Sequence, residues 1–210
     1  MSFDPAAAPA QRLLPETLES HLRRMGGRTT GMLLLANVAL AWASLISWSI
    51  SDPSLTHTTG TSVRNLLGPL GAVVSDLLLQ MLGLGAAFAL LAPMFWGIEL
   101  LASQGRVRLK GKIVLAPVAV ALLVGALSAL PTPANWPLHH GFGGIFGDFV
   151  YSLAVNVTGL IDPRRGGPVA GLLLFGLGAA LMARSLGSNL VDLAASLQRR
   201  HRPLEQPLTE

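Results

Sequence analysis

The sequence predicts an all-α integral membrane domain with four transmembrane helices as two hairpins plus an outer-face amphipathic helix. Its four long apolar stretches lie at about residues 31–48, 72–98, 113–130 and 168–183. Each reaches or approaches the roughly 20 residues that a helix needs to cross about 30 Å of hydrocarbon. Lipid offers the backbone no hydrogen-bond partner, so helix is the expected form. Only 12% of the 210 residues are charged, and this composition leaves little for a soluble domain.

The basic residues indicate how the chain is oriented. Twelve of the fifteen Lys and Arg residues lie before the first span, between the second and third spans, or from the end of the fourth span onward. The positive-inside rule therefore places both termini in the cytoplasm. These basic clusters also suit anionic headgroups. They lack interleaved aromatic residues or a nucleic-acid-reading element, which argues against direct DNA binding.

Three segments follow from this pattern. Residues 1–28 form a basic cytoplasmic leader in which 17–25 suits a short amphipathic helix, residues 29–186 form the membrane domain, and residues 187–210 begin a cytoplasmic linker. A signal-peptide cleavage site at residues 39–41 is the competing interpretation of the first span. Because the apolar stretch continues beyond that site, an uncleaved anchor is favoured.

Residues 145–161 are almost apolar enough to form a fifth span. Asp148, Ser152 and Asn156, however, recur at four-residue spacing and therefore share one helical face. This pattern predicts an amphipathic helix in the outer interface or against the bundle. A fifth crossing would also move the arginines near the C-terminus to the outside, against the charge rule.

Polar residues within the spans are candidates for packing or function. Asp76 and Gln80 share a face of the second span, and Asn37 lies at a similar depth in the first. We expect a Gln80–Asn37 hydrogen bond that fixes helix pairing. A membrane carboxylate is a functional candidate by default, but the shallow position of Asp76 favours a structural role. A small transporter or channel subunit that uses Asp76, Gln80 and Asn37 is the alternative interpretation.

Small residues at regular spacing predict close helix contacts. Gly125 lies between Ala121 and Ala129 in the third span, a pattern that permits close backbone approach within the chain or between copies. Glycines also recur at offsets of 3 and 12 in both halves, which suggests two related units: Gly68, Gly71 and Gly83, then Gly144, Gly147 and Gly159.

The sequence contains no recognisable catalytic, cofactor or metal site. It has no Cys, which excludes disulfides and thiolate ligands. The glycine-rich residues 141–147 lack the Gly-Lys-Ser/Thr ending of a phosphate loop. His139 and His140 lack a third ligand nearby in sequence, so a solvated loop is the favoured interpretation.

Three loop motifs resemble those of one family. They are Ser49-Ile50-Ser51-Asp52-Pro53-Ser54, then Asn65-x-x-Gly68-x-x-Gly71-Ala72-x-x-x-Asp76, then Gly143-Gly144-Ile145-Phe146-Gly147. With the basic leader and four spans, they resemble the four-helix N-terminal membrane domain of the FtsK/SpoIIIE DNA translocases. The resemblance covers about residues 25–190.

This resemblance implies a membrane anchor at the bacterial division septum that contributes to cell division and chromosome segregation. In that family a long linker leads to a hexameric motor that uses ATP and Mg and pumps chromosomal DNA. The sequence lacks Walker motifs, so it resembles an N-terminal domain without the motor, and it would meet DNA only through that missing part. The implied partners are the inner-membrane bilayer, divisome proteins and other copies of the chain. Residues expected to contact partners on the outer side are Asp52, Pro53, Asn65, Gly68, Gly71, Gly144, Gly147 and Asp148.

Overall fold

The computed structural model describes residues 16–54, 62–102 and 109–186, and within these ranges the chain is helical without strands. Its helices are α1 (Glu16–Ile46), α2 (Gly68–Leu82), the 3₁₀ turn η1 (Gly83–Gly85), α3 (Ala86–Ala102), α4 (Leu109–Ser128), α5 (Gly144–Gly159) and α6 (Gly166–Leu186). Among the described residues, four stretches are long and apolar enough to cross a membrane: Ser20–Ile46, Gly68–Ala102, Leu109–Ser128 and Gly166–Leu186. The predicted all-α, four-span fold class is confirmed. Most of the predicted leader and the whole predicted linker lie outside the described residues.

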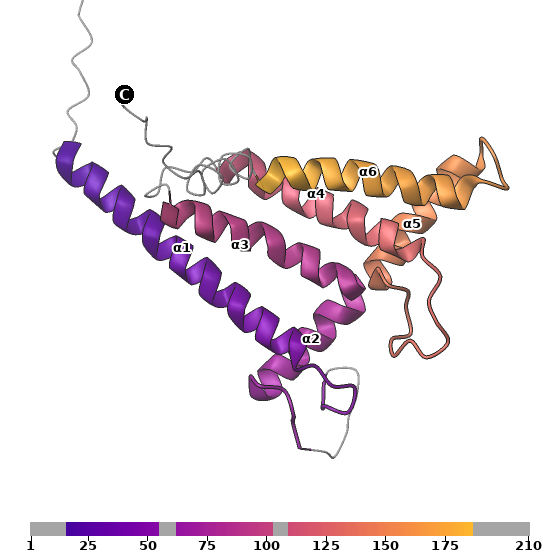
Figure 1. Cartoon of the computed structure of the whole chain (residues 1–210), viewed down its shortest axis with the longest axis horizontal. Coiled ribbons are helices and arrows are strands. Elements are labelled where there is room, and N and C mark those ends of the chain that lie inside the picture. The colour runs from indigo at the N-terminus through magenta and orange to yellow at the C-terminus, as the bar shows by residue number, and fades with distance from the viewer. Residues whose placement is uncertain (1–15, 55–61, 103–108, 187–210) are drawn as a thin grey trace, which may run out of the picture.

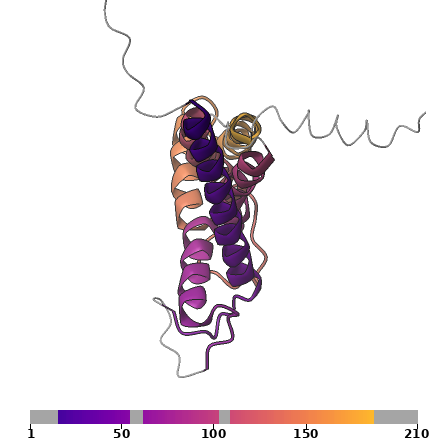
Figure 2. The ribbon, with the colours of Figure 1, turned by 90° about the vertical axis from the view of Figure 1, so that its left-hand side faces the viewer.

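The helices pack as two groups. α1 packs mainly against α3, and α4 packs mainly against α6, which runs beside it in Figure 1. The short loop between the second and third spans favours a tight hairpin there, but α3 and α4 contact each other much less. Seen edge-on, the helices lie within a narrow slab (Figure 2). We call the side where α1 begins and α6 ends the terminal end, and the opposite side the distal end.

The first helix is longer than the sequence pattern suggests. Residues 17–25 do not form a separate helix, because α1 runs without interruption over 31 residues. Gly26 and Gly27 lie inside it, and the Thr30 hydroxyl donates to Gly26 O at 2.9 Å. The helix ends at Ile46, before the loop that carries Asp52.

The second predicted span, at about residues 72–98, is divided into two helices. The second span breaks at η1, where Gly83 has a φ of +56° and ends α2. A side chain on Gly83 would collide with the carbonyl of Phe142, and the neighbouring Leu84 N–H donates to that same carbonyl at 2.8 Å. Pro93 lies inside α3 and does not end that helix.

The predicted internal repeat has a structural counterpart. Gly68 and Gly144 begin α2 and α5 with the same φ of +66°, in the left-handed region that favours glycine. Each donates its N–H three residues back, to Asn65 O at 2.9 Å and to Gly141 O at 3.0 Å. The order long helix, loop, glycine-started helix and long helix thus occurs twice. The structure supports two related three-helix units, α1–α3 and α4–α6.

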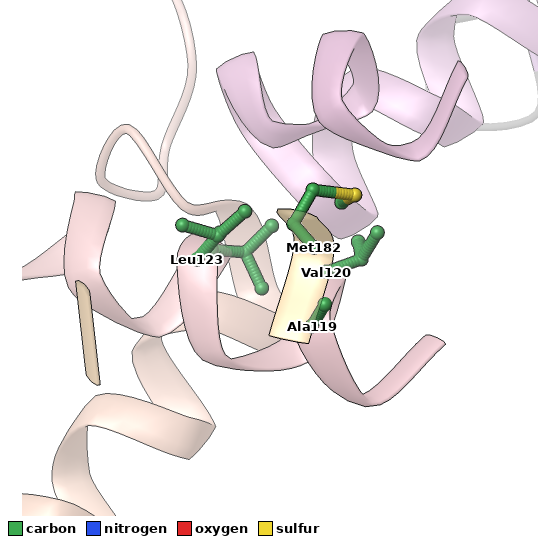
Figure 3. Packing of buried hydrophobic residues seen from close by; sticks show 5 residues of the cluster. Ala119, Val120, Leu123 and Met182 are labelled. Carbon is green, nitrogen blue, oxygen red and sulfur yellow. The ribbon is translucent and has the colours of Figure 1, made fainter. Parts of the chain in front are cut away.

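The buried core lies mainly between α4 and α6. Figure 3 shows Ala119, Val120 and Leu123 of α4 near Met182 of α6. Two residues beyond Leu123 on α4, a Cβ on Gly125 would lie 2.7 Å from Val150 Cγ1 of α5. It would also lie 3.1 Å from a methyl group of α6. The close approach expected at Gly125 is therefore made within the chain.

We predict that Gly125→Leu destabilises the folded chain. Overpacking of this kind costs about 1–3 kcal/mol, so the melting midpoint in detergent should fall. Gly176→Leu is the matched control, because a Cβ on Gly176 of α6 meets nothing within 4 Å. Equal melting midpoints for the two variants would contradict this packing assignment.

Candidate functional site

The most organised polar feature is a buried cluster at the distal end, formed by Ser44, Asp52, Asn65, Gly71 and Ser75. We call it the distal cluster. Its side chains are nearly inaccessible, with Asp52 3% and Asn65 5% exposed and both serines fully buried. Asp52 carries the first sequence motif, and Asn65, Gly71 and Ser75 lie in the second. The first and second motifs, which are separate in sequence, therefore come together in the distal cluster.

Asp52 closes the loop between α1 and α2. Its Oδ1 accepts the Arg64 N–H at 2.9 Å and its Oδ2 accepts the Asn65 N–H at 2.9 Å. Both carboxylate oxygens are thus used to hold two successive backbone groups. A buried carboxylate is costly unless it is hydrogen-bonded, and here the loop itself supplies the donors.

Asn65 joins this loop to two helices. Its Nδ2 donates to Ser44 O of α1 at 2.9 Å, and its Oδ1 accepts the Leu67 N–H at 3.1 Å, an Asx-turn contact. Gly71 O of α2 accepts both the Ser44 hydroxyl at 2.7 Å and the Ser75 hydroxyl at 2.8 Å. A side chain at Gly71 would collide with the Asn65 amide. The cluster fixes α1, the loop and α2 in one geometry.

A second feature is the glycine junction, formed by Gly83, Gly143, Gly144 and Gly147. Here the break between α2 and α3 meets the start of α5 and the end of α4. A Cβ on Gly144 would lie 2.6 Å from Gly83 N, and a Cβ on Gly147 would lie 2.5 Å from Val124 O. The two units of the repeat therefore contact each other backbone to backbone at this point.

Asp148 extends the glycine junction toward the surface. Its Oδ1 accepts the Ser128 hydroxyl at 2.7 Å, and its Oδ2 lies 3.3 Å from His140 Nδ1. The Trp136 indole donates to His140 O at 2.9 Å and packs edge-on against Phe142 at a centroid distance of 4.6 Å. The loop before α5 is thus held against the ends of α4 and α5. Within the described ranges, no three His, Asp or Glu side chains gather as a metal site.

The terminal end has its own polar ties. Lys112 Nζ of α4 lies 2.5 Å from Glu99 Oε2 of α3. The Trp96 indole of α3 donates to Ser185 O of α6 at 3.1 Å, and the Ser185 hydroxyl donates to Lys112 O at 3.2 Å. We call Trp96, Glu99, Lys112 and Ser185 the terminal cluster. It joins α3, which packs mainly against α1, to α4 and α6.

The predicted contact between Gln80 and Asn37 is wrong. Gln80 Nε2 donates to Asp76 Oδ2 at 3.1 Å, one turn away on its own helix. Asn37 is exposed on α1, and its Nδ2 donates to Leu33 O at 2.8 Å. Asp76 is only 6% exposed. The structure brings Asp76 and Gln80 together but leaves Asn37 apart, so the three residues do not line one path.

Several residues expected to contact partners instead lie inside the fold. Asp52, Asn65, Gly71, Gly144 and Gly147 are buried and make the contacts described above, because the loops fold back onto the helix ends. Pro53, Gly68 and Asp148 remain partly exposed.

Sequence reasoning missed Ser44, Ser128 and Ser185, which tie helices together. The available signal was a small hydroxyl residue inside or at the end of an apolar span, where it finds a backbone partner.

These features define an α-helical, multi-pass membrane domain whose loops are locked by buried polar contacts and glycine junctions. The family described as the 4TM region of DNA translocase FtsK/SpoIIIE matches residues 23–198, and the chain belongs to this family.

Similar proteins carry the name DNA translocase FtsK. The protein from Mesorhizobium japonicum is 37% identical over 191 residues, which cover 87% of this chain and 21% of that protein. The one from Agrobacterium fabrum is 36% identical over 157 residues, 70% of this chain and 18% of its own length. The one from Brucella suis is 41% identical over 121 residues, 57% of this chain and 14% of its own length. No solved structure matches. The chain spans about a fifth of the length of the first two relatives.

We predict that Asp52→Asn destabilises the domain. An amide offers one acceptor oxygen where the carboxylate uses two, so one backbone N–H would face an NH₂ group. Losing a hydrogen bond to a charged group costs about 1.5–3 kcal/mol. The melting midpoint in detergent should fall accordingly.

Asp162→Asn is the matched control for this prediction. Asp162 also accepts two backbone N–H groups, from Arg164 at 2.9 Å and Arg165 at 3.3 Å. It does so with a single oxygen in an exposed loop, which an amide can reproduce. If both variants melt alike, the distal cluster does not hold the loop as described.

Proposed function

We propose that this chain is the membrane anchor domain of a bacterial septal DNA translocase, holding a motor at the division site and so contributing to cell division and chromosome segregation. The observation that carries the proposal is the match of residues 23–198 to the membrane region of that family. The relatives named DNA translocase FtsK are several times longer than their matched parts. ATP, Mg and DNA would be bound by the motor part of such a protein, and this chain would contribute no catalysis.

The arrangement of the helices supports an anchoring role. α6 ends at the terminal end, on the same side of the domain as the start of α1 (Figure 1). A motor that follows α6 would pull on Leu186 and the preceding residues. Ser185 passes such a load to α3 through Trp96 and to α4 through the Lys112 carbonyl. α6 also packs along α4, so the force is shared among three helices rather than concentrated on one.

The distribution of basic residues supports one orientation of this anchor in the membrane. Twelve of the fifteen basic residues lie in segments that meet the terminal end, which would face the cytoplasm by the positive-inside rule. The distal end would then face outward from the inner membrane. Exposed residues there, such as Arg64, Leu66 and Leu70, offer a surface for divisome proteins or for other copies in a hexamer.

We predict that a cysteine at the distal loop and one at the terminal end label from opposite sides of the membrane. The natural chain has no Cys, so His139→Cys and Arg184→Cys are each the sole thiol. Both positions are exposed. In intact spheroplasts a membrane-impermeant maleimide should label the first and reach the second only after permeabilisation. The reverse pattern would overturn the proposed sidedness.

The anchor and transporter hypotheses differ in what Asp76 does. We predict that a fluorescent fusion of the chain gathers at the division site in the bacterium that carries it, and that Asp76→Asn leaves this band unchanged, because an amide can still pair with Gln80. A transporter or channel that relies on Asp76 would lose ion flux in proteoliposomes with the same substitution. A diffuse fusion would count against the anchor, and a flux lost on substitution would favour the transporter.

A further inference from the structure

An apolar groove of about 510 Å³ lies between α3 and α4. Its walls include Ala89, Pro93 and Trp96 of α3 and Ile113 and Pro117 of α4, with Phe146 of α5 also lining it. Every residue that lines it is apolar. It exists because α3 and α4 contact each other sparsely, whereas their other neighbours pack closely. The groove therefore lies within membrane-spanning helices and needs an apolar occupant.

Charged residues frame the groove at the terminal end. Glu99 follows Trp96 by three residues, and Lys112 directly precedes Ile113. Both charged residues therefore lie just beyond the apolar residues that line the groove on α3 and α4. Their ion pair bridges the two helices, with side chains only 14% and 17% exposed. This bridge closes the terminal end of the groove and is electrically neutral as a pair.

Lys110 adds a positive charge at the same place. It precedes Ile113 by three residues and Pro117 by seven, so it shares their face of α4. Unlike Lys112, it is exposed. Since the Glu99 carboxylate is paired with Lys112, Lys110 leaves the mouth of the groove with a net positive charge. An occupant with an apolar chain and an anionic head would satisfy both parts of this surface.

We propose that the groove between α3 and α4 binds an acyl chain of an anionic phospholipid whose phosphate group lies against Lys110. The groove-lining stretch from Ile113 to Ala121 of α4 is about 12 Å long at 1.5 Å per residue, comparable with one leaflet of a hydrocarbon core about 30 Å thick. A helix about 10 Å across does not fit between two helices that are still joined by an ion pair. The site does not depend on the proposed motor or on septal placement.

The test uses the full chain in detergent with equimolar dioleoyl phosphatidylglycerol and dioleoyl phosphatidylcholine, and native mass spectrometry counts the retained lipids. We expect preferential retention of phosphatidylglycerol. Lys110→Gln should reduce its retention about fivefold, the factor expected for one basic residue near an anionic surface. Arg184→Gln is the matched control, because it removes an exposed positive charge at the terminal end of α6. Equal retention of the two lipids, or equal effects of the two variants, overturns the proposal.

A second pair of variants tests the groove itself. Ala121→Leu places a larger side chain in the groove and should reduce retention of both lipids, whereas Ala39→Leu on the exposed face of α1 should not. If Ala121→Leu fails to fold, the Lys110 and Arg184 pair still decides, because both residues are exposed. In native membranes, Ala121→Cys supplies the only thiol. Its disulfide dimerisation would assign the groove to a second copy of the chain and overturn the lipid assignment.

Discussion

The constraint that governs this structure is that hydrocarbon cannot satisfy a backbone polar group. An α-helix satisfies its own backbone polar groups, but the α-helical structure is interrupted at η1 and in the loops. At η1 the Leu84 N–H finds Phe142 O, and in the first loop two N–H groups find the Asp52 carboxylate. Among the described residues, no buried side-chain nitrogen or oxygen lacks a partner. The irregular backbone at η1 and beside Asp52 therefore obtains its hydrogen-bond partners from other parts of the chain.

This requirement also joins the two three-helix units. At the break in the first unit, the Leu84 N–H donates to Phe142 O, which lies in the loop before α5 of the second unit. The hydrogen bonding at this break therefore needs both units. Glycine makes the contact possible, since a side chain on Gly83 or Gly144 would occupy the space of the opposing backbone. The terminal cluster joins the same units at the other end. Two attachment points restrict rotation of one unit against the other.

Hydropathy and charge predict the all-α, four-span fold, because span length and composition follow directly from the bilayer. They do not predict which helices pair: α3 and α4 are joined by a short loop yet remain loosely packed. The break at Gly83 was missed because its cause is Phe142, which is 59 residues away in sequence. The loop motifs were identified from sequence, but their expected role differed. Asp52 and Asn65 look like surface residues in an outer loop, while the structure buries both and bonds Asn65 to Ser44 and Ser75. Whether a loop is buried depends on tertiary contacts, and the local sequence pattern does not predict these contacts.

The length of α1 has a mechanical consequence. Its 31 residues form a rod about 46 Å long at 1.5 Å per residue, well beyond a hydrocarbon core of about 30 Å. Its distal end is fixed by Ser44, and Gly31 lies close against Gly97 of α3. A helix of this length either tilts in the bilayer or extends past the hydrocarbon core. Because α1 is continuous from these contacts back to Glu16, the start of the helix is held in a fixed direction relative to the packed core.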